Sequence, residues 1–175
     1  MQRETILALI GAVAALVLDI VISPSLMVFS ATPNFIIAYA VVLSMVHRSN
    51  ATFIIAFALG MLADLLGYGP VGCLAFLLVL VSFASSRVSA AFDDGALMTP
   101  MVLMAIFIAA VELLHAVVML ALTSGVSAID AIVYLAIPCT MFDIVLGLIL
   151  YPILSRIFVA KRPTMGSEPP TARLR

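Results

Sequence analysis

Four acidic residues interrupt otherwise apolar stretches of the sequence, and their side chains are the ones most able to take part in chemistry. They are Asp19, Asp64, Glu112 and Asp143, and His115 follows Glu112 by three positions. An ionisable group at the middle of a bilayer costs about 2.5 to 3.5 kcal/mol on insertion scales, so such groups must face a bundle interior or a watery cavity. Because a spacing of three keeps two residues on one helical face, we expect the side chains of Glu112 and His115 to form a hydrogen bond with each other.

Three roles for this buried polar set remain open: hydrogen bonds between helices, a pathway for protons or a solute, and contact with a partner helix. Catalysis is less favoured. Two carboxyls that share a proton can activate water, but Asp64 lacks the Gly-x-Gly-Asp context of intramembrane aspartyl proteases. The sequence shows no nucleophilic triad, no metal-ligand cluster and no Lys-Ser/Thr pair of a phosphate loop. The residues therefore indicate no catalytic site and no cofactor.

The elements that position these groups are predicted to be transmembrane helices. The chain is 65% hydrophobic and 10% charged, which is more apolar surface than a small water-soluble core can hide. One span takes about 20 mostly apolar residues. We therefore expect an all-α, polytopic membrane protein with a bundle of about six transmembrane helices in residues 1–160 and a disordered basic cytoplasmic tail in residues 161–175. Apolar runs place the helices near residues 5 to 23, 33 to 47, 51 to 66, 71 to 86, 99 to 122 and 131 to 158.

The distribution of positive charge predicts that both termini are cytoplasmic. Cytoplasmic loops retain Lys and Arg, whereas short translocated loops lack them. The predicted outer loops, near residues 24 to 32, 67 to 70 and 123 to 130, contain no Lys or Arg. With the N-terminus inside, every cation of the chain falls on the cytoplasmic side: Arg3, Arg48, Arg87, Arg156, Lys161, Arg162, Arg173 and Arg175. The net charge of −1 and the lack of a basic patch exclude nucleic acid as a partner, which leaves the lipid bilayer as the first one.

Three short motifs resemble the family of the rod shape-determining protein MreD. They are Pro33-Asn34-Phe35-Ile36-Ile37, the stretch from Phe57 to Leu66 in which Gly60 precedes Asp64 by four, and Gly69-Pro70-Val71-Gly72. The family shows a Pro-Asp/Asn-hydrophobic opening to its second helix, a third helix that ends in Gly-x-x-x-Asp, and a Pro-x-Gly turn into the fourth. The chain length and the six-helix layout are also similar.

The resemblance implies a non-enzymatic scaffold in the cytoplasmic membrane. Such proteins work with the bitopic MreC, with the wall-elongation enzymes RodA and a class B penicillin-binding protein, and indirectly with the actin-like MreB, to direct lateral peptidoglycan synthesis and maintain rod shape. It makes Pro33, Gly60, Asp64, Pro70 and Gly72 candidate structural or partner-contact residues. We expect Gly60 to allow close helix packing, Asp64 to cap or bond across the bundle, and the Pro70 turn to set the angle into the fourth helix.

A second class stays open, the substrate-binding S component of an energy-coupling-factor vitamin transporter. These proteins are also small six-helix bundles, and they use an Ala-x-x-x-Ala pair in the first helix to dock on a transmembrane partner. Ala8 and Ala12 satisfy that pattern, and the buried acids could line a solute site. Against this, the predicted outer loops are short and offer few groups to close over a vitamin.

Overall fold

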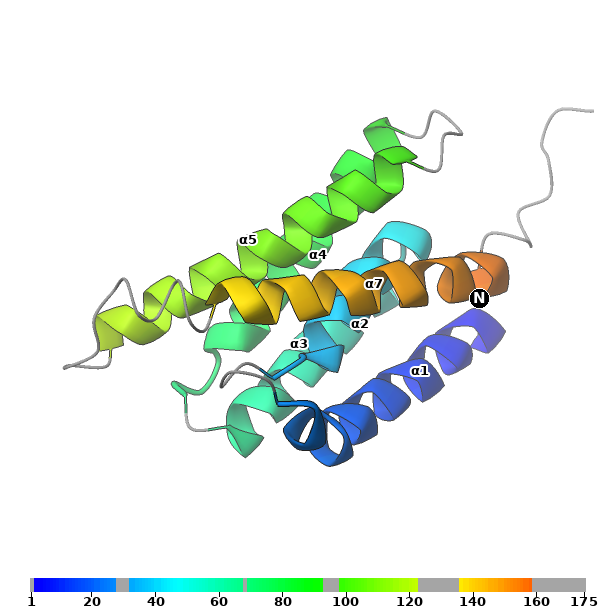
Figure 1. The fold of residues 1–175 in the computed structure, drawn as a ribbon. Helices are drawn as coiled ribbons and strands as arrows, with labels where there is room; N and C mark the ends of the chain where they lie inside the picture. Colours follow the sequence, from blue (N-terminus) through cyan, green and yellow to red (C-terminus); the bar gives the residue numbers. More distant parts are fainter. Residues whose placement is uncertain (1, 28–31, 68, 93–97, 123–135, 159–175) are drawn as a thin grey trace, which may run out of the picture.

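The structure is a computed structural model that describes residues 2–27, 32–67, 69–92, 98–122 and 136–158. Within these ranges it contains helices and no strand, which confirms the expected all-α fold (Figure 1). The elements in chain order are α1 (Gln2–Val21), the 3-10 helix η1 (Ser23–Leu26), α2 (Phe35–Val46), α3 (Asn50–Leu66), α4 (Cys73–Ala91), α5 (Met98–Leu122) and α7 (Ile137–Phe158).

Most helix bounds lie close to the predicted ranges, and the end of the fourth helix differs most. The fourth helix runs on to Ala91 instead of ending at residue 86. Arg87 therefore lies in the helix and not in a loop, and its guanidinium group stacks 5.2 Å from the ring centroid of Phe83. The last helix is described from Ile137 onward. Residues 131–135 and the expected tail 161–175 lie outside the described residues.

Four of the described helices, α1, α4, α5 and α7, are long and apolar enough to cross a membrane. The other two, α2 and α3, are apolar but have 12 and 17 residues. Large apolar side chains cover the outward faces, and many are more than half exposed, such as Ile10, Val102 and Val145. Water is a poor solvent for so much apolar surface, whereas lipid is a good one. The chain is therefore a multi-pass membrane protein.

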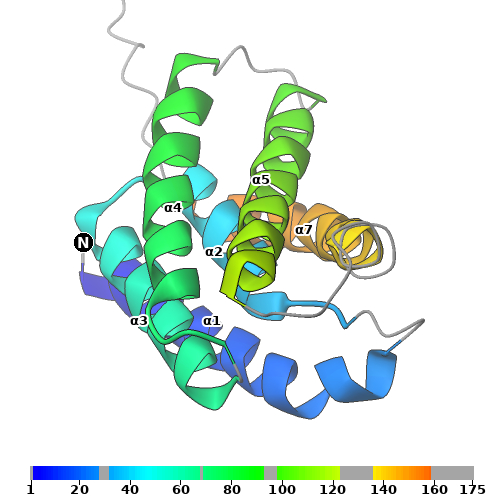
Figure 2. The ribbon, with the colours of Figure 1, turned by 90° about the vertical axis from the view of Figure 1, so that its left-hand side faces the viewer.

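Helix α2 is the centre of the bundle. It contacts each of the five other described α-helices, and Figure 2 shows it enclosed by them. All residues from Ile36 to Val46 are buried, as expected for a helix that is apolar on every side. At about 1.5 Å per residue it is roughly 18 Å long, shorter than the roughly 30 Å hydrocarbon layer. Helix α2 alone is therefore too short to span that layer.

The end of the bundle where α2, α4 and α7 finish carries arginines, and we call it the arginine end. Arg48 follows α2 and donates from Nη2 to the carbonyl of Ser89 at 2.9 Å. That carbonyl is in the last turn of α4, where the negative end of the helix dipole favours a cation. His47 stacks on Phe158 with the ring centroids 5.0 Å apart, which joins the ends of α2 and α7. Helix α1 begins at the same end of the bundle (Figure 1), where Glu4 acts electrostatically on His47, so Arg3 belongs to the arginine end.

Candidate functional site

Asp64, in the last turn of α3, closes the start of α4. Its Oδ2 accepts hydrogen bonds from the backbone N–H groups of Gly72 at 2.9 Å and Ala75 at 3.1 Å, and its Oδ1 accepts from Leu74 at 3.2 Å. The first N–H groups of a helix have no partner within it, and a carboxylate supplies both acceptors and the charge that the helix dipole favours. Asp64 is 6% exposed. It therefore serves as an N-terminal cap that one helix provides to the next.

Gly60 and Gly72 make this cap possible. A Cβ atom at Gly60 would lie 2.5 Å from the Cα atom of Ala75, so the missing side chain lets α3 approach the backbone of α4. Gly72 has a φ of +94°, in the left-handed region that favours glycine. The turn is closed by a hydrogen bond from the N–H of Cys73 to the carbonyl of Pro70 at 3.3 Å.

The start of α2 is held by two more acids, from helices at opposite ends of the sequence. Asp19 of α1 accepts from the N–H of Phe35 at 2.8 Å, and Asp143 of α7 accepts from the N–H of Asn34 at 2.6 Å. The side chain of Asn34 caps its own helix by accepting from the N–H of Ile37 at 3.0 Å. Pro33 precedes this cap, and its carbonyl accepts from Ser23 Oγ at 2.6 Å. We call this end of the bundle, where α2 and α4 begin, the acidic end.

The expected pair between Glu112 and His115 does not form. The carboxyl group of Glu112 lies beside that of Asp143 on α7. His115 instead faces the side where Asp64 lies, and its Nδ1 is buried without a hydrogen-bond partner among the described residues. Oδ2 of Asp143 also lacks a partner there. The spacing of three puts both α5 residues on one side of the helix, but α7 packs against one flank and the α3–α4 junction against the other.

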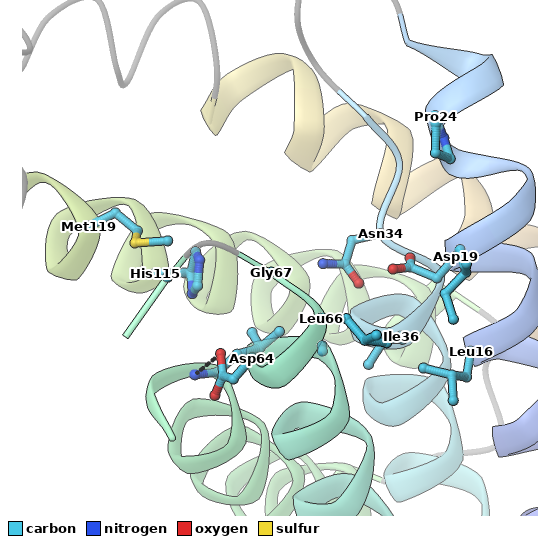
Figure 3. A pocket seen from close by; sticks show the side chains of 14 residues that line it. Leu16, Asp19, Pro24, Asn34, Ile36, Asp64, Leu66, Gly67, His115 and Met119 are labelled. Carbon is cyan, nitrogen blue, oxygen red and sulfur yellow. Dashed lines mark hydrogen bonds between the residues drawn. The ribbon is translucent and has the colours of Figure 1, made fainter. Parts of the chain in front are cut away.

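A cavity of about 410 Å³ opens at the acidic end between α1, α5 and the junction of α3 with α4. Figure 3 shows Asp19 and Asn34 on one side of it and His115 with Met119 on the other. Most of the side chains that line it are apolar, and the polar ones are Asp19, Asn34, Asp64 and His115. The lining residues are Leu16, Asp19, Ile20, Pro24, Asn34, Ile36, Ala63, Asp64, Leu66, Gly67, Gly69, Leu74, His115 and Met119.

Of the residues singled out in the sequence, Asp19, Asp64 and His115 meet at this cavity, whereas Glu112 and Asp143 pair next to the start of α2. The residue that sequence reasoning undervalued is Asn34, which caps α2 and lines the cavity. Its signal was present, because an Asn directly before an apolar helical run is a typical N-cap.

The carboxyl groups in this arrangement act as hydrogen-bond acceptors. Asp19, Asp64 and Asp143 each bind backbone N–H groups, so they hold helix starts in place. In the part of the chain that the structure describes, no group of three or more His, Cys, Asp and Glu side chains could hold a metal ion. The cavity offers a bound group the carboxylate of Asp19 as a hydrogen-bond acceptor.

One prediction separates hydrogen bonding from charge at the start of α2. The substitution Asp143→Asn is expected to change the free energy of unfolding by less than about 1 kcal/mol, because the amide oxygen still accepts from the N–H of Asn34. Asp143→Leu leaves that N–H unpaired and is expected to cost about 1 to 3 kcal/mol. Unfolding of the purified chain in detergent by SDS titration measures both. Equal losses for the two variants would contradict the hydrogen-bonding role.

Comparison with known proteins identifies the family of this chain. The family model described as the rod shape-determining protein MreD matches residues 2–161, which include every described helix and both capped helix starts. No curated protein and no solved structure was found to match the chain.

Proposed function

Because this chain belongs to the family of the rod shape-determining protein MreD and so has a role in determining rod shape, we propose that it is a non-enzymatic membrane scaffold of the cell-wall elongation complex. In this role it helps to direct lateral peptidoglycan synthesis and to maintain rod shape together with MreC and MreB. It resides in the cytoplasmic membrane with both termini in the cytoplasm.

The observation that most supports this proposal is the use made of the buried acids. Asp19, Asp64 and Asp143 bind backbone N–H groups at the starts of α2 and α4. In an enzyme, such buried acids would often mark the active site. In this chain they hold α1, α2, α3, α4 and α7 in position relative to one another. A rigid bundle with apolar outward faces is suited to binding other transmembrane helices. We therefore propose an MreC-like bitopic protein as the direct partner, RodA and a class B penicillin-binding protein as further partners, and MreB as an indirect one.

The orientation is supported by the separation of charge along the bundle. The described cations Arg3, Arg48, Arg87 and Arg156 are near the starts or ends of helices at the arginine end, and the capping acids lie at the other. Cytoplasmic loops are the ones that retain cations, so the arginine end faces the cytoplasm and the acidic end faces outward. A cysteine placed beside Arg48 should stay unlabelled by a membrane-impermeant reagent added to intact cells. Labelling at that position would overturn the orientation.

The transporter alternative was based on the Ala8–Ala12 pair and on the buried acids, and the position of the alanine pair does not support it. Ala8 and Ala12 are 0% and 4% exposed, and the hydroxyl of Tyr39 on α2 donates to the carbonyl of Ala8 at 2.6 Å. The pair therefore packs inside the chain and has no free face for docking. The cavity at the acidic end remains compatible with a solute. A vitamin that copurifies with the chain together with a transporter ATPase would favour that reading.

The test of the scaffold role is replacement in the chain's own host. Depletion of the protein is expected to turn rods into wide or spherical cells, and re-expression is expected to restore the width. Affinity purification from mild detergent is expected to recover an MreC-like bitopic protein. Cells that keep their width during depletion, with no such protein recovered, would refute the proposal.

A further inference from the structure

The cavity at the acidic end contains a carboxylate with free lone pairs and has no cation among its described lining residues. None of its described lining residues is Lys or Arg, and the described arginines lie at the arginine end. Asp19 gives one oxygen to the N–H of Phe35, which leaves lone pairs of its carboxylate for another donor. His115 lines the opposite side of the cavity in Figure 3, but its Nδ1 is buried in the protein. Asp19 is therefore the carboxylate that the cavity offers to a cation.

The rest of the wall suits an alkyl chain. Leu16, Ile20, Leu66 and Met119 line the cavity together with the acceptors. A volume of about 410 Å³ is larger than a bare ion needs and falls within the range of sites for organic groups. Lys and Arg combine an apolar stem with a cationic head that carries several N–H donors.

From this complementarity we propose that the cavity is a socket for a Lys or Arg side chain, contributed by a partner protein's segment at the outer surface of the membrane. The inference rests on the proposed scaffold function, since it assumes a protein partner at that surface. The cationic head binds the carboxylate of Asp19, and the stem lies along Leu16 and Ile20, which line the cavity on the same helix.

Charge favours a protein side chain over a lipid amine. The ammonium group of phosphatidylethanolamine is joined to a phosphate, which would bring a negative charge close to Asp19 and Asp64. Like charges in a partly desolvated site repel one another. A basic side chain brings no anion with it.

The test uses analogues of the two side chains on the full chain in phosphatidylcholine nanodiscs. The probes are n-propylguanidinium for Arg and n-butylammonium for Lys, with n-butanol and n-butyrate as neutral and anionic controls at constant ionic strength. We expect at least one cationic probe to raise the unfolding temperature saturably at millimolar concentration, and the controls to leave it unchanged. No saturable effect from either cation, or an equal effect from butanol, overturns the proposal.

Two variants assign the effect to the cavity. Asp19→Asn keeps an acceptor for the N–H of Phe35 but loses the charge, and we expect it to weaken probe binding at least tenfold. Glu4→Gln, which removes a carboxylate at the far end of α1, should bind the probe as the unmodified chain does. Equal binding by Asp19→Asn and the unmodified chain refutes the site.

A third variant supplies the cation from a side chain of the protein itself. Ile20 lines the cavity and is 52% exposed, so Ile20→Lys can extend an ammonium group into the cavity that Asp19 also lines. We expect this variant to unfold at a higher temperature than the matched Ile20→Leu and to ignore the added probes. Binding of the probes by Ile20→Lys with unchanged affinity counts against the proposal.

A further experiment tests whether the amine that occupies the cavity comes from a lipid headgroup. If phosphatidylethanolamine in the nanodiscs stabilises the chain through Asp19 while the side-chain analogues do nothing, the occupant is a lipid headgroup and the proposal is wrong. These outcomes are independent of the scaffold test, because a chain that binds no probe can still restore cell width and recover its bitopic partner.

Discussion

Replacing Asp64 by leucine is expected to lower the free energy of unfolding by about 3 kcal/mol or more, since each buried N–H left without a partner costs about 1 to 3 kcal/mol. Three such groups, at Gly72, Leu74 and Ala75, lose their acceptor together. Asp64→Asn keeps one oxygen as an acceptor, and it should cost about half as much. SDS titration of the purified chain, followed by circular dichroism, measures the loss.

The control for this prediction is Glu4→Gln, which removes a carboxylate from the first turn of α1 and should leave stability within about 0.5 kcal/mol of the unmodified chain. Recovery of the MreC-like partner provides a second readout, because the α3–α4 junction shapes the outer end of the bundle. Unchanged stability in Asp64→Leu, together with normal partner recovery and normal cell width, would show that this carboxyl has neither role.

The substitution Gly60→Val is expected to be as damaging, by a different mechanism. The first side-chain atom would lie 2.5 Å from the Cα atom and 2.7 Å from the backbone nitrogen of Ala75. Backbone atoms cannot rotate away as the tip of a side chain can, so α3 and α4 must separate, and Asp64 then withdraws from the start of α4. Overpacking alone costs about 1 to 3 kcal/mol, and loss of the cap adds to it. We expect a total of about 3 kcal/mol or more.

A matched control stands on the same helix. Ala58 is exposed, so Ala58→Val adds comparable bulk that meets no neighbouring backbone and should change stability by less than about 0.5 kcal/mol. The double variant Gly60→Val with Asp64→Leu should lose clearly less than the sum of the two single losses, because both break the same contact. Full additivity would mean that Gly60 and Asp64 act separately.

The sequence allowed the local features to be predicted, because they depend on neighbours along the chain. Long apolar runs predicted the helices. The arrangement at Asp64 follows from Gly60 one turn earlier and a glycine-rich turn a few residues later, so the partners of this carboxylate lie within 11 positions of it. A helical hairpin brings such residues together whatever the rest of the fold does.

The non-local features could not be predicted in this way. Asp19 and Asp143 meet the start of α2 only because α1 and α7 flank it, and periodicity does not say which helices are neighbours. The same gap explains the wrong prediction for His115. Helical spacing placed it near Glu112, but the packing of α7 against α5 gave Glu112 a different partner. The central place of α2 is a similar case, because its uniformly apolar sequence fits either burial in protein or exposure to lipid.

The bond between Asn34 and Asp143 joins residues 109 positions apart, and this has a consequence for biogenesis. When α2 leaves the ribosome, the segment that will complete its first turn has not been synthesised. Until α7 is inserted, the nascent protein lacks the acceptor for one N–H group at the start of its central helix. Assembly of this protein therefore finishes only with its last helix, and chains truncated before α7 should be substrates for membrane proteases.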